Sequence, residues 1–98
     1  MAKTYDELVP KLVRGNYVVT LKNVIYRYTT PEGPVREYRV ATVTHNAHTR
    51  ERARLIAETA LREKRVQSAS VYDPKTKIRH LRTRGMDTWS PPFPSEIP

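Results

Sequence analysis

One segment of the sequence constrains the fold more than any other, because residues 49–65 carry the periodicity of an amphipathic helix. Apolar side chains recur there at spacings of three and four residues, which places them on one stripe of a helix with about 3.6 residues per turn. The stripe comprises Ala53, Ile56, Ala57, Ala60 and Leu61. Its alanines are small enough to let a β-sheet approach closely, so the segment predicts one helix packed against a sheet.

The residues at the two ends of this segment support a helix. Thr49 can act as the N-cap, because its hydroxyl can accept a hydrogen bond from an amide of the first turn. Lys64 and Arg65 place positive charge near the C-terminal end, where it complements the helix dipole. Leu55 departs from the pattern, since it projects nearly opposite Ala53. An exposed leucine is common, but Leu55 is also a candidate contact for the C-terminal segment or for a partner.

Four segments that flank the helix are rich in Val, Ile, Tyr and Thr, a composition typical of β-strands. They are residues 17–30, 35–44, 66–72 and 77–83. The sequences PEGP at 31–34 and DPKT at 73–76 are turn signals, so we expect the segments to pair as two hairpins. The predicted fold is α+β, with one antiparallel four-stranded sheet and the main helix across one face.

The apolar pattern of the first hairpin contains an irregularity. Val19 and Leu21 share one parity, whereas the later tyrosines share the other. A bulge or a tight bend near Lys22 and Asn23 would reconcile the two halves of the strand. Beyond that point we expect an aromatic inner face built from two cross-strand pairs. The expected pairs are Tyr28 with Tyr38 and Tyr26 with Val40.

The two termini have different characters. Thr4 and Glu7 have the spacing of a capping box, so we expect a short helix near residues 5–13 that ends at Gly15. A chain of 98 residues has room for one domain, which we place at residues 1–84. Residues 85–98 are rich in proline, which favours an extended backbone and disfavours helix or central strand. This segment is therefore predicted to be an extended tail.

The tail also holds the only tryptophan and the only phenylalanine of the sequence, Trp89 and Phe93. A disordered segment rarely retains such side chains. Three arrangements remain open: the rings dock on their own domain with Leu55 as a receptor, they bind another chain, or the segment is disordered. In the second arrangement, Leu55, Trp89 and Phe93 form a partner-binding surface.

The residue inventory argues against catalysis and metal binding. The absence of cysteine excludes disulfides, thiol catalysis and four-cysteine zinc sites. The three glycines cannot build a phosphate-binding loop, and no serine lies in a nucleophile-elbow pattern. His45, His48, His80 and Asp73 lack the convergent pattern of a zinc site, so we expect ordinary hydrogen-bonding histidines. We therefore predict a protein that is not an enzyme and that needs no metal or cofactor.

The sequence also bears on localisation. Its N-terminus contains no apolar run that resembles a signal peptide, and no segment approaches the roughly 18 apolar residues required to span a bilayer. The lack of cysteine fits a reducing compartment. We expect a cytoplasmic protein without membrane contact.

The net charge is +8, and the basic excess is concentrated in the second half of the domain. Residues 50–84 hold eleven Lys and Arg against four Asp and Glu, whereas residues 85–98 hold two acidic residues and no basic ones. This distribution favours polyanionic partners. The candidate phosphate contacts lie on the two hairpins and comprise Arg27, Arg36, Arg39, Lys75, Lys77, Arg79, Arg82 and Arg84. Arg27 and Arg39 are expected to share the face opposite the tyrosines.

These observations predict a small, basic, non-enzymatic binding protein that holds DNA or RNA on a cationic hairpin surface. The alternative is a protein–protein interaction module that uses the tail to bind a partner or to self-associate. A small regulator, an inhibitor, a phage accessory protein or an assembly subunit would each fit that alternative. Affinity that falls steeply with salt would favour nucleic acid, whereas a loss of binding on deletion of the tail would favour a protein partner.

Overall fold

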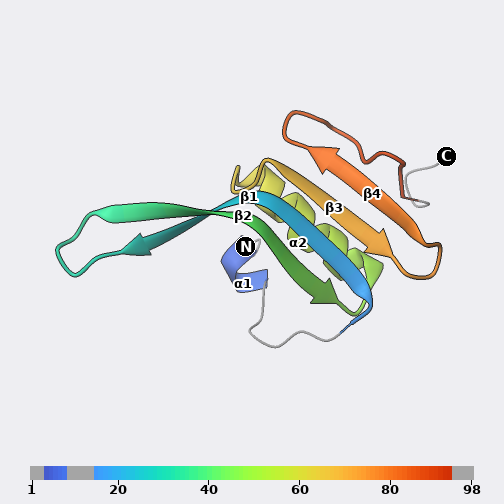
Figure 1. Cartoon of the computed structure of the whole chain (residues 1–98), viewed down its shortest axis with the longest axis horizontal. Coiled ribbons are helices and arrows are strands. Elements are labelled where there is room, and N and C mark those ends of the chain that lie inside the picture. The colour runs from blue at the N-terminus through green and yellow to red at the C-terminus, as the bar shows by residue number, and fades with distance from the viewer. Residues whose placement is uncertain (1–3, 9–14, 94–98) are drawn as a thin grey trace.

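The computed structural model describes residues 4–8 and 15–93, and its strands form one antiparallel sheet with a helix across one face (Figure 1). The elements are α1 (Tyr5–Leu8), β1 (Tyr17–Thr29), β2 (Val35–Ala47), α2 (Arg50–Arg62), β3 (Ser68–Asp73) and β4 (Ile78–Thr83). The strand order is β2-β1-β3-β4. The predicted α+β fold is confirmed, and so is the start of the short N-terminal helix, as α1; the remainder of its predicted range, 9–13, lies outside the described residues.

Helix α2 packs on β1 and β3 through the predicted stripe. Ala53, Ile56, Ala57 and Ala60 are buried, and Leu61 is partly buried. The predicted N-cap is present, since the Thr49 hydroxyl accepts a hydrogen bond from the Arg52 amide at 3.1 Å. The small side chains let the helix lie close to the sheet, as the sequence suggested.

The helix ends at Arg62, before the limit of residue 65 predicted from the sequence. Lys64 adopts a positive φ of 57°. Its amide donates to the Leu61 carbonyl at 3.0 Å, and the Arg65 amide donates to the Ala60 carbonyl at 2.9 Å. This is the Schellman pattern of hydrogen bonds, which closes a helix and turns the chain away from its axis.

Arg65 therefore leaves the helix and becomes a buried link between elements. Its Nε donates to the Ile25 carbonyl at 2.7 Å, and its Nη1 lies 3.1 Å from the Asp6 carboxylate. The guanidinium also lies over the Tyr5 ring, 5.5 Å from the centroid. One side chain thus ties α1 to the middle of β1.

The irregularity in β1 is a bend without an inserted residue. The pairing of β1 with β2 runs from Tyr17↔Ala47 to Thr29↔Val35, and within it Asn23 does not pair with a residue of β2. Asn23 has a φ of 54°, a left-handed conformation that asparagine tolerates. The pairs Lys22↔Thr42 and Val24↔Val40 on either side keep one register. In β1, therefore, the residues that face the helix side have odd numbers before the bend and even numbers beyond it, and β2 changes at the paired position.

The first hairpin pairs two residues away from the expected register. Tyr26 lies opposite Tyr38, and Tyr28 lies opposite Arg36. The reason is the turn: the Thr30 amide and hydroxyl both donate to the Pro34 carbonyl, at 3.4 and 3.3 Å, so Thr30 lies opposite Pro34 rather than Arg36. A shift of two residues preserves facing, so the tyrosines still share one side.

The hairpin of β1 and β2 is longer than the sheet behind it. Strand β3 pairs with β1 only from Val18 to Lys22. Residues 24–40 therefore extend as a two-stranded ribbon, which we call the arm, away from the rest of the molecule (Figure 1). The arm accounts for the elongated shape, with a longest dimension of 51 Å against 30 and 29 Å for the others.

The C-terminal segment returns to the domain. Ser90 pairs with Leu81 at the edge of β4 through two hydrogen bonds of 2.9 Å. Trp89 and Phe93 are 2% and 0% exposed and belong to the core. Leu55, proposed from the sequence as their receptor, is 44% exposed. The part of the predicted tail at residues 94–98 lies outside the described residues.

Helix α2 and β4 supply the surroundings of the two rings. The Trp89 Nε1 donates to the Glu58 carboxylate at 3.0 Å. Phe93 lies between the His80 ring, 3.9 Å away between centroids, and the Arg54 guanidinium, 4.5 Å from its centroid. Within the described residues, no helix is long and apolar enough to cross a membrane.

Candidate nucleic-acid interface

The face of the sheet that α2 leaves uncovered is largely polar, and none of the strand residues described on it carries a carboxylate. Side chains alternate between the faces of a strand, and directly paired residues share a face. Val19 and Leu21 of β1 are buried on the helix side, so Thr20 and Lys22 lie on the other, which we call the open face. It comprises Val18, Thr20, Lys22, Thr42, Thr44, Asn46, Ser68, Ser70, Tyr72, Arg79, Leu81 and Thr83.

Arg79, predicted from the sequence, lies on the open face. Its guanidinium sits 5.7 Å from the centroid of the Tyr72 ring, and its Nη1 lies 3.4 Å from the Ser70 hydroxyl. Lys22 joins it there and donates to the Thr42 hydroxyl at 3.2 Å. The sequence analysis did not select Lys22, although its position between the buried Leu21 and the bend signalled an outward side chain.

A hollow of about 580 Å³ opens where the arm leaves the sheet. Its lining comprises Asn23, Ile25, Arg39, Gln67, Ser68, Thr83 and Arg84. Two predicted cations, Arg39 and Arg84, therefore meet at one place although 45 positions separate them in the sequence. Residues 25 and 39 lie on the same side as the open face because the bend at Asn23 exchanges the two sides to which odd- and even-numbered side chains of both strands point.

Arg27 lies on the same side of the arm as Arg39, as predicted, but it is paired. Its Nε contacts the carboxylate of Glu37, which lies directly opposite, at 3.0 Å. Both side chains are exposed, so the pair contributes little to stability. Glu37 nevertheless lowers the positive potential that Arg27 would offer to a polyanion.

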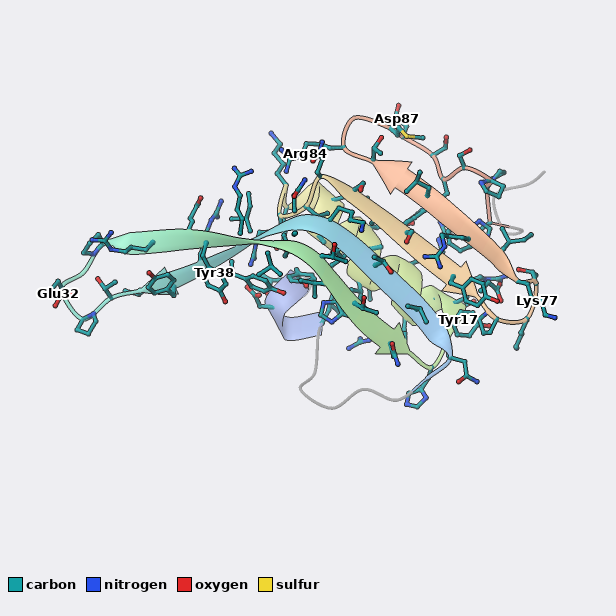
Figure 2. All side chains as sticks on the ribbon, viewed as in Figure 1. Tyr17, Glu32, Tyr38, Lys77, Arg84 and Asp87 are labelled. Carbon is teal, nitrogen blue, oxygen red and sulfur yellow. The ribbon has the colours of Figure 1, made fainter. Side chains whose placement is uncertain are left out.

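The remaining predicted cations do not join this side. Arg36 lies opposite Tyr28, on the other side of the arm. Arg82 lies opposite the buried Ala69, which directs it to the helix side, where its Nε donates to the Met86 carbonyl at 3.0 Å. Lys75 and Lys77 lie in the turn between β3 and β4, and Figure 2 shows Lys77 at the far end of that hairpin from Arg84. The eight cations therefore do not form a single surface.

The other side of the arm carries an aromatic row (Figure 2). The rings of Tyr26 and Tyr38 stack with centroids 5.3 Å apart, and Tyr28 lies 6.0 Å from Tyr38. At the inner end of the row, the Tyr5 hydroxyl lies 2.6 Å from Nε2 of His45. Tyr28 and Tyr38 are 48% and 52% exposed, so the row passes from the core to solvent.

Burial at the inner end of this row shifts two ionisation equilibria. Burial, together with a hydrogen bond to Tyr26, raises the pKa of Tyr5. Burial lowers the pKa of His45 from its ordinary value of 6.5, because the imidazolium form loses hydration. Both groups are therefore neutral in the folded protein at neutral pH.

The lowered pKa of His45 predicts a loss of stability in weak acid. Below about pH 6.5 the unfolded chain gains a proton at this residue while the folded chain remains neutral, so unfolding becomes easier as pH falls through the folded pKa. The slope from this residue is at most about 1.4 kcal/mol per pH unit. Urea unfolding between about pH 7.5 and 5.5 should show a weaker decline for His45→Gln than for wild type. The exposed His48 supplies the control, and an equal effect of His48→Gln would contradict this assignment.

The three histidines lie apart rather than in one cluster. His45 contacts Tyr5, His48 is exposed just before α2, and His80 stacks on Phe93 with its Nδ1 2.6 Å from the Pro91 carbonyl. Over residues 4–8 and 15–93, no group of three or more His, Asp or Glu side chains could hold a metal ion.

Comparison with known proteins leaves the function to be inferred from this geometry. The chain matches no protein-family model, no curated protein and no solved structure. The open face, the hollow and the aromatic row of the arm are the features that a function must use.

Proposed function

We propose that the protein binds nucleic acid across the open face of its sheet, with the hollow at one end of the contact surface. The observation that carries this proposal is the charge of that side. Among the described residues, the open face contains no carboxylate, displays Lys22 and Arg79, and adjoins the hollow with Arg39 and Arg84. Phosphate groups are bound by such cations, with hydroxyl groups as additional hydrogen-bond donors.

Hydroxyl side chains are abundant among the cations. Thr20, Thr42, Thr44, Ser68, Ser70 and Thr83 all lie on the open face. All of these except the buried Ser70 are accessible and can donate a hydrogen bond to a phosphate or sugar oxygen without regard to base sequence. The net charge of +8 would attract a polyanion from a distance and speed its association. These features support binding to the backbone rather than readout of bases.

The test is a salt-titrated binding assay with fluorescent 20-mer DNA and RNA, single-stranded and duplex. With about four contacted phosphates, affinity should fall roughly 100-fold between about 50 and 200 mM salt. The double substitution Lys22→Glu with Arg79→Glu should weaken binding at least about tenfold, because it replaces two phosphate contacts with repulsive charges.

Arg50→Glu with Arg62→Glu is the matched control, because it changes the net charge equally on α2, on the covered side of the sheet. We expect it to weaken binding less than about threefold, through the change in long-range attraction alone. Equal losses in the two double variants would show that total charge, and not the open face, determines binding. Binding that is insensitive to salt would contradict the proposal.

A protein partner is the second candidate, and the arm rather than the tail now favours it. Trp89 and Phe93 are occupied in the core. Tyr28, Val35 and Tyr38 are exposed on the arm, and β2 lies at the edge of the sheet. A partner could add a strand to that edge and cover the aromatic row. Its affinity would depend on Tyr38 and only weakly on salt, which separates the two candidates.

A further inference from the structure

We infer that the hollow at the base of the arm is a binding site for the phosphate of a nucleotide unit. Where that phosphate belongs to a nucleic-acid backbone, the inference rests on the proposed function. The volume of the hollow, about 580 Å³, exceeds what one phosphate needs and falls in the range of small-ligand pockets. The described residues of the lining supply two guanidinium groups, two hydroxyl groups and two amides, and none of them is a carboxylate. The two positive charges, with no opposing carboxylate among these residues, favour an anion over a cation.

Arg84 is held in place before any ligand arrives. Its Nη2 donates to the carbonyls of Lys64 and Val66, at 3.0 Å each, and its amide donates to the Gln67 carbonyl at 2.8 Å. Among the described residues, its Nε and Nη1 have no recorded hydrogen bond. A guanidinium fixed by backbone carbonyls loses little conformational freedom on binding, and its planar fork matches phosphate oxygens.

Arg39 supplies the second cation from the arm. It lies opposite Ile25 and forms no ion pair with any described residue, in contrast to Arg27. Its position on this side depends on the reversal of parity at Asn23. Two cations on separate elements can therefore approach one phosphate from two directions, which raises affinity and selects the orientation of the ligand.

The polar side chains complete the site. Asn23 Nδ2 donates to Gln67 Oε1, which joins β1 to the loop before β3. The Ser68 and Thr83 hydroxyls lie on paired positions of β3 and β4 and have no recorded hydrogen bond among the described residues. They are available to donate to phosphate oxygens. The site is thus assembled from β1, β2, the loop before β3, the first residue of β3, and the end of β4 with the residue that follows it.

Two kinds of probe test the site and separate it from the proposed function. The oligonucleotides used for the salt titration report the backbone contact. Inorganic phosphate and a nucleoside 5′-monophosphate, added to the full chain labelled with nitrogen-15, report the site alone through amide shifts near residues 23, 67, 68, 83 and 84. We expect both small probes to shift these amides and the monophosphate to bind more tightly.

Three substitutions sharpen the expected result. Arg39→Gln should weaken oligonucleotide binding about 5–10-fold and lower the salt slope by about 0.7–0.9. Thr83→Val should weaken it about threefold without changing the slope, because it removes a hydrogen bond and no charge. Arg27→Gln, which removes an equal charge outside the hollow, should change affinity less than about twofold, since Glu37 already neutralises it.

Each outcome decides between the alternatives. Shifts with both probe types that are lost in Arg39→Gln support a backbone phosphate in the hollow. Shifts with the monophosphate but no oligonucleotide binding retain the site, as one for a free nucleotide phosphate, and refute the proposed function. Oligonucleotide binding that is unchanged in Arg39→Gln, with no shift at the hollow amides, overturns the inference and leaves the proposed function standing.

Discussion

Replacing Trp89 with alanine should lower the free energy of unfolding by about 3–5 kcal/mol, the usual cost of removing a buried aromatic side chain. The indole is 2% exposed and meets the Phe93 ring edge to face, with centroids 5.2 Å apart. Its Nε1 donates to Glu58, so truncation also leaves a half-buried carboxylate without that donor. Much of the net stability of a domain this small would be lost.

The measurement is urea denaturation followed by circular dichroism, because the variant lacks the only tryptophan. Trp89→Phe should lose less, about 1–2 kcal/mol, since it keeps an aromatic ring and removes the hydrogen bond. Leu55→Ala is the control, because Leu55 lies on the exposed side of α2, the helix that carries Glu58. It should change the free energy of unfolding by less than about 0.5 kcal/mol. A loss below about 1 kcal/mol for Trp89→Ala would show that the C-terminal segment is not part of the folded core.

The second large effect is expected at Gly15. Its φ is 153°, and an added Cβ would lie 2.0 Å from the Ala47 carbonyl oxygen and 2.6 Å from the His48 amide nitrogen. Both contacts are to the backbone at the end of β2, which leads directly into α2. That backbone cannot swing aside as a side chain could, so Gly15→Ala should cost about 3 kcal/mol or more.

Gly33→Ala is the matched control for this effect. Gly33 also has a positive φ, of 108°, but nothing lies within 4 Å of its added Cβ. Gly33→Ala should therefore lower the free energy of unfolding only by the cost of backbone strain, about 1 kcal/mol. Thermal and urea unfolding of both variants can be followed by Trp89 fluorescence. Equal losses at the two positions would show that strain, and not the close approach of residues 15 and 47, makes glycine necessary.

The candidate site was only partly predictable, for a reason visible in individual residues. Arg39, Arg79 and Arg84 were selected from the sequence and lie on one side of the molecule. Arg82 was selected too, but alternation beside the buried Ala69 turns it to the helix side. Composition identifies a basic segment, whereas the face on which each charge lies depends on strand register.

The register between β1 and β2 depends on the hydrogen bonds of their turn, which the strand propensities of the residues do not reveal. The PEGP turn was recognised, but whether Thr30 lies opposite Pro34 or opposite Arg36 changes every cross-strand pair by two residues. The hydrogen bonds that Thr30 donates to the Pro34 carbonyl place it opposite Pro34. Similarly, the C-terminal limit of α2 follows from the left-handed Lys64, a residue without a local signal for that conformation.

The sequence by itself determined the elements and the class of the fold, because local periodicity and turn residues act between near neighbours. It identified the helix stripe, both hairpins, the cap at Thr49 and the bend near Asn23. Only the tertiary structure decided where Trp89 lies and that Arg39 meets Arg84. Those outcomes depend on surfaces assembled from residues far apart in the chain, which no local pattern records.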